Sequence, residues 1–178
     1  YTLHKVDLAK GAQKTPEFLA INPAGQVPAL VDDEAGVTLA QSIAIVLYLA
    51  EKSGKLMPKD AKARASALWW VAYSASDVSG AVGGYLGFTR SNLADKPAPV
   101  AEWLAGRVAG ALAQADKALA DGRAFLCGAE FSVADVAFAP AAARAKDVPG
   151  VAGLAHLHGS LARGMARTGM PMGYAVLA

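Results

Sequence analysis

The sequence predicts an α+β protein with two domains, a small α/β unit followed by an all-helical domain. Short apolar runs alternate with turn residues over residues 26–39, a pattern typical of short strands. The stretch Ser53-Gly-Lys-Leu-Met-Pro58 then supplies a glycine and a proline in succession, which ends a helix and starts a linker. From residue 60 on, apolar residues recur with a helical period. We therefore expect domains at residues 1–53 and 60–178.

The α/β unit is expected to hold three strands and one helix. Thr2–Leu8 alternates between apolar and polar residues like a strand that needs a partner, so we expect a preceding segment. Gln26–Val31 is a second strand and Val37–Leu39 a third, very short one. The acidic stretch 32–36 ends in glycine and forms the turn between them. An almost uniformly apolar helix follows over Gln41–Lys52.

The helical domain is expected to contain four long helical stretches. The first is rich in alanine and contains glycines at Gly80 and at Gly83-Gly84, where a break is expected. Ser132 and Asp135 have the spacing of a capping box, in which both side chains bind free N–H groups at a helix start. The expected helical stretches cover residues 60–86, 100–119, 132–145 and 153–168.

Composition excludes several classes of protein. No apolar run reaches the roughly 20 residues that a membrane helix needs, and residues 1–5 do not begin a secretory signal. A net charge of +2 on 178 residues is too small to indicate nucleic acid. The single cysteine, Cys127, excludes an internal disulfide and suits a reducing cytoplasm, and it is expected to be a buried small residue. The three histidines have no metal-binding spacing, so no metal is expected.

The dipeptide Val27-Pro28 is a candidate backbone-binding element. An X-Pro bond before a strand is a candidate cis peptide, and a cis bond would turn the Val27 N–H and C=O outward to pair with an extended peptide. The alternative is an ordinary trans proline on an edge strand. Taken alone, the dipeptide favours the trans alternative, because cis bonds are a small minority.

The dipeptide Gln41-Ser42 opens the apolar helix and is a candidate anion-binding element. A serine in the first helical turn can bind a carboxylate together with the free N–H groups and the helix dipole, and Gln41 can add its amide. The alternative is plain helix capping, which serine performs routinely. Taken alone, the pair favours capping.

The order of these elements resembles the glutathione S-transferase family. The resemblance rests on Asn22-Pro-Ala-Gly-Gln-Val-Pro-Ala-Leu30, an acidic glycine turn, and Leu39-Ala-Gln-Ser42 opening an apolar helix. Phe125-Leu-Cys-Gly-Ala-Glu-Phe-Ser-Val-Ala-Asp135 is similar to the family's capping-box segment. The linker before Pro58 falls where the family joins its two domains, and the resemblance spans most of residues 2–149.

The resemblance implies a thioredoxin-like domain, here without its first βα unit, followed by an all-helical domain. Glutathione, as co-substrate, would bind the first domain, with the Val27-Pro28 backbone on its cysteinyl part and Gln41 and Ser42 on its γ-glutamyl end. Gln26, together with Lys10 or Lys14, would approach the glycyl end. A hydrophobic electrophile would lie between the domains; the residues expected to line its pocket are Trp70, Tyr73 and Ser79. Members with this motif are usually homodimers.

Two departures limit what the resemblance carries over. The family's catalytic Ser, Tyr or Cys follows the first strand of the fold, so we expect it upstream of Tyr1 and name no catalytic residue. The bacterial beta class carries a histidine in the first helix of its second domain. That position aligns near Ser79, so the chain is beta-class-like but lacks this histidine.

The function expected from this resemblance is glutathione transfer to hydrophobic electrophiles, as in detoxification. A positioned donor would lower the thiol pKa from about 8.5, and the thiolate would then attack the electrophile. The alternative is a binding or regulatory protein that keeps the fold without catalysis. A carrier of apolar compounds is a third interpretation.

Overall fold

The first unit, residues 1–53, is built on a two-stranded antiparallel hairpin. The computed structural model describes residues 1–168. Strand β1 (Ala29–Asp32) pairs with β2 (Val37–Ala40), with Ala29 opposite Ala40 and Asp32 opposite Val37. The turn between them closes at Gly36, whose φ of 65° lies in the left-handed region that favours glycine. The two strands confirm the expected hairpin.

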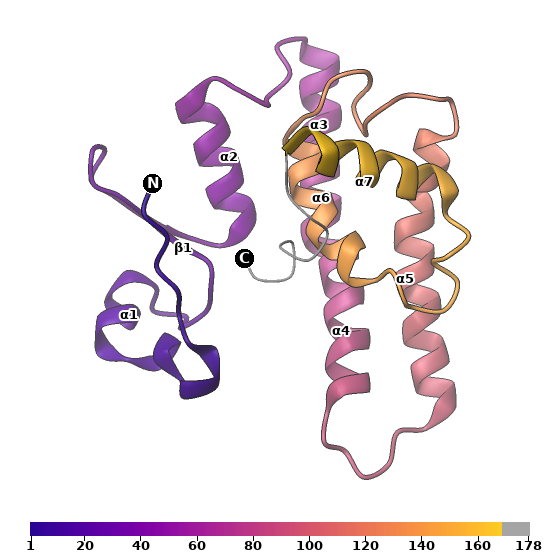
Figure 1. The fold of residues 1–178 in the computed structure, drawn as a ribbon, viewed down its shortest axis with the longest axis horizontal. Coiled ribbons are helices and arrows are strands. Elements are labelled where there is room, and N and C mark those ends of the chain that lie inside the picture. The colour runs from indigo at the N-terminus through magenta and orange to yellow at the C-terminus, as the bar shows by residue number, and fades with distance from the viewer. Residues whose placement is uncertain (169–178) are drawn as a thin grey trace. The chain divides into compact units, whose positions relative to one another are not determined.

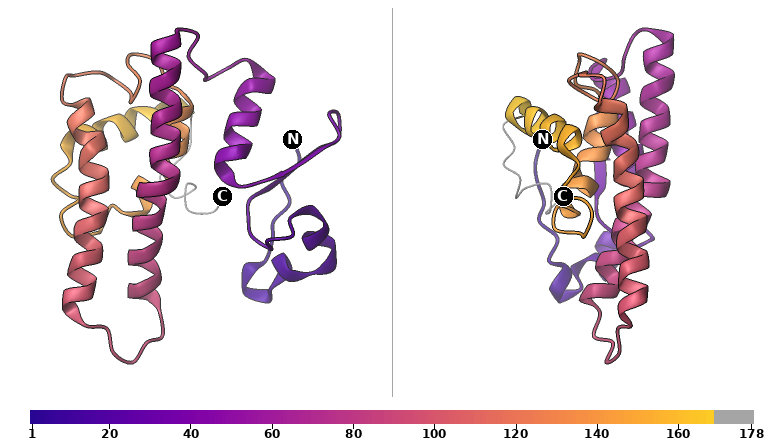
Figure 2. Two further views of the ribbon diagram at one scale, coloured as in Figure 1. Left: turned by 180° about the vertical axis from the view of Figure 1, so that it is seen from behind. Right: turned by 90° about the vertical axis from the view of Figure 1, so that its right-hand side faces the viewer.

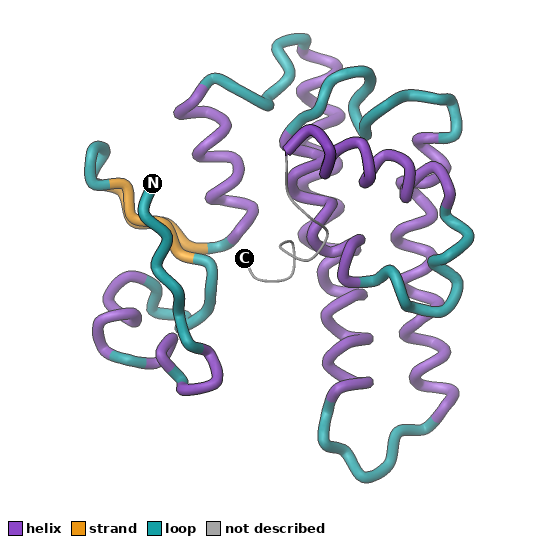
Figure 3. Tube along the Cα trace, in the orientation of Figure 1, coloured by secondary structure: helices purple, strands orange, loops and turns teal. Residues whose placement is uncertain are grey.

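Helical segments flank this hairpin on both sides in the chain (Figure 3). Helix α2 (Ser42–Ser53) follows β2 directly and corresponds to the expected apolar helix. The segments before β1 are two 3-10 turns and a short helix that begins at a proline: η1 (Leu8–Lys10), η2 (Ala12–Lys14) and α1 (Pro16–Ile21).

The strand expected at residues 2–8 is wrong. Residues 1–7 have no regular secondary structure, and η1 begins at Leu8. Among the described residues only β1 and β2 form a ladder, so the alternating run has no strand to pair with. An alternating pattern becomes a strand only when another strand satisfies its N–H and C=O groups.

The second unit begins at Gly54 and is helical throughout its described part (Figure 1). Its elements are α3 (Ala61–Tyr73), a single π-helical turn η3 (Ser74–Val78), α4 (Ser79–Arg90), α5 (Ala98–Leu119), α6 (Val133–Arg144) and α7 (Ala155–Thr168). Helices α4 and α5 run side by side and are joined by one loop (Figure 2). In the described part of the chain, no helix has both the length and the apolarity needed to cross a bilayer.

The core of this unit is built from buried residues of α3, α4, α5 and α6. Val108 and Leu112 of α5 and Val133 of α6 are fully buried, and the Phe138 side chain is 1% exposed. The Ser74 hydroxyl, also fully buried, donates a 2.8 Å hydrogen bond to the Ala137 carbonyl. That bond satisfies a polar group that would otherwise destabilise the core.

The long first stretch is interrupted, although not at the glycines. The irregularity is η3, and Gly80, Gly83 and Gly84 all lie inside the regular helix α4. A glycine costs a helix only about 1 kcal/mol, which packing readily offsets. The π turn inserts an extra residue next to Ser74, whose bond to α6 holds this turn in place.

The capping box at the start of α6 is confirmed. The Asp135 carboxylate accepts hydrogen bonds from the Ser132 main-chain N–H at 2.9 Å, the Ser132 hydroxyl at 3.0 Å and the Leu126 N–H at 2.9 Å. Asp135 is 7% exposed, and burial raises its pKa. This carboxylate therefore ties the loop before α6 to the helix itself.

Candidate functional site

The hairpin register brings the two candidate dipeptides to the same end of the ladder. Ala29 pairs with Ala40 at this end of the ladder, and Pro28 and Gln41 are the next residues along the two strands. Opposed residues in an antiparallel pair lie about 4.5–5.5 Å apart at Cα. The ladder runs directly into α2 at this end (Figure 3). A backbone segment and a helix N-terminus that are remote in sequence are thus neighbours.

Val27 presents a free edge of main chain at this site. The Val27–Pro28 peptide bond is cis, not trans. The Val27 side chain is 38% exposed, and within residues 1–168 its N–H and C=O make no hydrogen bond. An extended peptide can pair with such groups as it would with a strand edge.

Gln41 holds an unusual backbone conformation where β2 passes into α2. Its φ is 72°, in the left-handed region, although it is not a glycine. Its carbonyl accepts the first bond of the helix, from the Ile45 N–H at 3.0 Å. A left-handed non-glycine residue costs about 1–2 kcal/mol, and such outliers concentrate at functional sites. The conformation keeps Gln41 exposed beside the helix start.

Ser42 is the first residue of α2 and is exposed. Because the first helical bond comes from Ile45, the N–H groups of residues 42–44 have no partner inside the helix. The first turn contains no acidic side chain that would compete for them. In the described part of the chain, the Ser42 hydroxyl also makes no hydrogen bond. This end of α2 can therefore accept a carboxylate.

Asn22 positions the loop before Val27, a role that the sequence analysis did not assign. Its side-chain Nδ2 donates to the Gln26 carbonyl at 2.6 Å, and its Oδ1 accepts from the Ala24 N–H at 3.1 Å. Asn22 is 5% exposed, and both bonds are part-buried. An asparagine that opens an Asn-Pro-Ala-Gly turn is the signal that could have revealed it.

Gly25 allows this loop to approach the lysine-bearing segment closely. Its φ is 60°, and a Cβ there would lie 2.7 Å from Lys14 Nζ. Lys14 Nζ in turn donates to the Ala24 carbonyl at 3.4 Å. Lys10 instead pairs with Asp7 at 3.6 Å on the exposed η1 turn. Lys14, rather than Lys10, is therefore the lysine that contacts the loop leading to Val27.

A polar cluster at the other end of the hairpin anchors α2. Asp32 Oδ2 accepts hydrogen bonds from the Tyr48 hydroxyl at 2.7 Å and from Lys52 Nζ at 2.5 Å. Lys52 also pairs with Glu34 at 3.0 Å. These bonds, from Lys52 first and then Tyr48, lower the pKa of Asp32 to about 2. The cluster fixes α2 against the hairpin, so the helix start keeps its place beside Pro28.

The residues predicted to line an electrophile pocket belong to the helical unit. Trp70 is 5% exposed and packs edge-on against Phe138, with 5.8 Å between ring centroids. The Tyr73 hydroxyl donates to the Ala111 carbonyl at 3.1 Å, and burial raises its pKa. Ser79 is exposed at the start of α4. Their role in binding stays a prediction.

Two other sets of residues offer little chemistry. Cys127 is half-buried, its Sγ lies 4.0 Å from the Ser66 hydroxyl, and burial raises its pKa, which disfavours the thiolate. Among residues 1–168, no three His, Cys, Asp or Glu side chains gather as metal ligands.

Family comparisons agree with this architecture. The glutathione S-transferase N-terminal domain matches residues 1–51, and the C-terminal domain of the same family matches residues 97–163. A small sheet unit with helices, followed by an all-helical unit, is the glutathione S-transferase fold. The chain belongs to the glutathione S-transferase family.

Individual relatives and solved structures are similar to this chain over different lengths. Disulfide-bond oxidoreductase YfcG of Escherichia coli K12 is 45% identical over 76 residues, covering 40% of this chain and 35% of that protein. Glutathione S-transferase GstA of Escherichia coli O157:H7 is 31% identical over 139 residues, covering 76% and 65%. The structure of a Burkholderia graminis glutathione transferase with two bound glutathione molecules per subunit superposes with a TM-score of 0.88 at 26% identity, covering 96% of this chain and 75% of that one.

The chain thus spans about a third of YfcG and 65% of GstA.

Proposed function

We propose that this chain binds glutathione and is part of a glutathione S-transferase, which conjugates the glutathione thiol to hydrophobic electrophiles. The observation that supports it is the hairpin end at the Ala29–Ala40 pair, which is flanked by the unpaired Val27 main chain on one strand and by the open N-terminus of α2 on the other. Glutathione is an extended peptide with a free carboxylate at its γ-glutamyl end. One part of it matches the strand-like edge and the other the helix start.

Each residue predicted to bind glutathione has a part in this proposal. The Val27-Pro28 main chain pairs with the cysteinyl unit. Gln41 and Ser42 bind the γ-glutamyl carboxylate and amine. Gln26 and the neighbouring lysines are candidates for the glycyl carboxylate, with Lys14 better placed than Lys10 because it contacts the 22–26 loop.

The proposal is tested with full-length protein by two measurements. Calorimetric titration with glutathione measures binding, and conjugation of 1-chloro-2,4-dinitrobenzene measures transfer. Saturable binding together with turnover is expected. Binding without turnover on a panel of electrophiles would instead support the non-catalytic alternative. If the protein did not bind glutathione at millimolar concentration, the proposed glutathione site would be ruled out.

A second candidate function is reduction of disulfides with glutathione. The similarity to the oxidoreductase YfcG over 76 residues favours it, as does the presence of two glutathione molecules per subunit in the Burkholderia graminis structure. In this reaction two glutathione thiols reduce one substrate disulfide. The products are one glutathione disulfide and two substrate thiols, and two protons pass from the glutathione thiols to the products.

A single pair of assays separates the two functions. Full-length protein is given bis(2-hydroxyethyl) disulfide in one assay and the chlorodinitrobenzene in the other, both with glutathione. Faster turnover of the disulfide would favour the oxidoreductase, and faster loss of the aryl chloride would favour the transferase. The Ser42→Ala variant should slow whichever reaction is present, because both need bound glutathione.

The remaining expectations are part of the same proposal. We propose a homodimer working in the cytoplasm, with a beta-class-like site that lacks the beta-class histidine near Ser79. Sedimentation of full-length protein tests the dimer. A detoxification role requires that the preferred electrophile be toxic to the cell of origin.

A further inference from the structure

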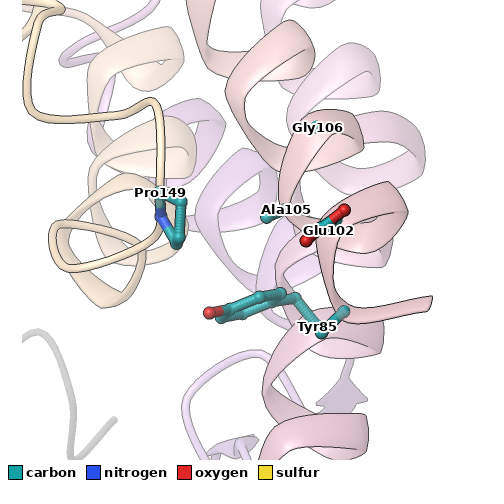
Figure 4. A pocket seen from close by; sticks show the side chains of 6 residues that line it. Tyr85, Glu102, Ala105, Gly106 and Pro149 are labelled. Carbon is teal, nitrogen blue, oxygen red and sulfur yellow. The ribbon is translucent and has the colours of Figure 1, made fainter. Parts of the chain in front are cut away.

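A small groove on the helical unit is lined by apolar residues and one carboxylate, and it takes no part in the proposed glutathione site. It has a volume of about 330 Å³, within the usual range for small-ligand pockets. Its walls come from α4, α5 and the loop before α7 (Figure 4). The residues that line it are Tyr85, Ala101, Glu102, Ala105, Gly106 and Pro149.

The lining is apolar apart from one charge. Tyr85 extends its ring from α4 toward the loop that carries Pro149, and Glu102 projects its carboxylate from α5 (Figure 4). Of the lining residues only Glu102 carries charge, and within the described residues it forms no ion pair. An apolar wall beside one unpaired carboxylate matches a ligand with an apolar body and one cationic group.

The backbone keeps the groove open and its walls fixed. Gly106 lies four residues after Glu102 on α5, so both are on one face of the helix. A Cβ at Gly106 would meet nothing within 4 Å, so the glycine leaves room for a ligand. A Cβ at Gly150 would lie 3.2 Å from the Ala109 Cβ, so the loop beside Pro149 packs closely on α5.

We propose that this groove binds a small organic amine, with the ammonium group on the Glu102 carboxylate and the apolar body between Tyr85 and Pro149. An aromatic ring suits the Tyr85 side through ring packing, and the ammonium gains further attraction when it lies near the face of that ring. Anions are disfavoured by Glu102. The site is therefore selective for charge, whereas its apolar walls tolerate different ligand bodies.

The test uses 2-phenylethylammonium as probe and 2-phenylethanol as its neutral counterpart. NMR titration of full-length protein should show saturable shifts at the Gly106 amide and the Tyr85 ring with the amine. The alcohol should bind at least about fivefold more weakly, since its neutral hydroxyl forms a weaker hydrogen bond to the Glu102 carboxylate than an ammonium does. Glu102→Gln should reduce the affinity for the amine to that for the alcohol.

A filling variant locates the binding. Gly106→Leu places a side chain in the groove and should abolish the shifts, whereas Gly110→Leu, one turn further along α5, should leave them unchanged. Equal affinity for amine and alcohol, or unchanged affinity in Glu102→Gln, would overturn the role of the charge and the proposal with it. No saturable shift, or shifts that survive in Gly106→Leu, would overturn the site.

Discussion

Two serines lie at helix starts, Ser42 in the first unit and Ser132 in the second, and their surroundings differ. Ser132 is 2% exposed, and both its N–H and its hydroxyl bind the Asp135 carboxylate. Ser42 is exposed, follows a left-handed Gln41, and has no carboxylate in its helical turn. The helix start at Ser132 is closed by the protein's own carboxylate, and the helix start at Ser42 is left open.

This difference distinguishes a structural helix cap from a ligand-binding helix start. A helix N-terminus must find an acceptor for its free N–H groups. When a side chain of the same turn supplies it in a buried place, the element contributes stability. When the turn is exposed and lacks such an acceptor, the acceptor can be a ligand carboxylate.

The largest expected effect is a loss of stability at the closed helix start of Ser132. Asp135→Ala leaves three buried donors without their acceptor and should lower the free energy of unfolding by about 3 kcal/mol. Urea denaturation followed by circular dichroism measures it. Asp95→Ala, at an exposed loop position, is the control and should change stability by less than about 0.5 kcal/mol. A loss below about 1 kcal/mol in Asp135→Ala would show that the closed cap is not the stabilising element.

Exchanging the two serines for alanine should separate the two roles. Ser42→Ala is expected to weaken glutathione binding by about 1–3 kcal/mol, roughly 5- to 150-fold in Kd, with stability nearly unchanged. Ser132→Ala should lower stability by about 1–2 kcal/mol and leave the glutathione Kd as it was. Calorimetry and denaturation are run on both variants. If Ser42→Ala lost stability and kept its affinity, Ser42 would be a cap like Ser132.

A substitution at Gln41 tests whether the backbone before the open helix start is strained. Gln41→Gly removes the cost of a left-handed side chain and should raise the free energy of unfolding by about 0.5–1 kcal/mol, while glutathione binding weakens. The matched control is Gln114→Gly in the exposed middle of α5, which should lower stability by about 1 kcal/mol. Stability changes of the same sign in both variants would argue against strain at Gln41.

The smallest effect concerns the ionic anchor of the open helix. The pKa of Asp32 is lowered to about 2 in the folded protein, against an ordinary value of 3.8, so its contribution is present above about pH 4 and is lost as the pH falls toward 2. Melting temperatures of wild type and Asp32→Asn should therefore converge over that range. Asp33→Asn, next to it and exposed, should parallel wild type throughout. A wild-type minus Asp32→Asn difference that does not change with pH would contradict the lowered pKa.

Much of the fold was predictable because its signals are local. The hairpin turn at Gly36, the apolar run of α2 and the Ser132–Asp135 spacing each depend on a few adjacent residues. The strand expected at residues 2–8 failed because a strand depends on a distant partner. The π turn at Ser74 was missed for a similar reason, since it depends on a hydrogen bond to Ala137.

The candidate site divides in the same way. The sequence by itself determined the residue types of the proposed glutathione site, in the two dipeptides Val27-Pro28 and Gln41-Ser42, because turns and helix starts depend on neighbouring residues. Only the tertiary structure decided that the two lie at the same end of the hairpin, through the pairing of Ala29 with Ala40. Only it decided that Asn22 holds the loop, and that Ser42 is exposed while Ser132 is sealed. Whether a residue is exposed, and which residues lie beside it, depends on segments far apart in the chain. These segments come together only when the chain folds.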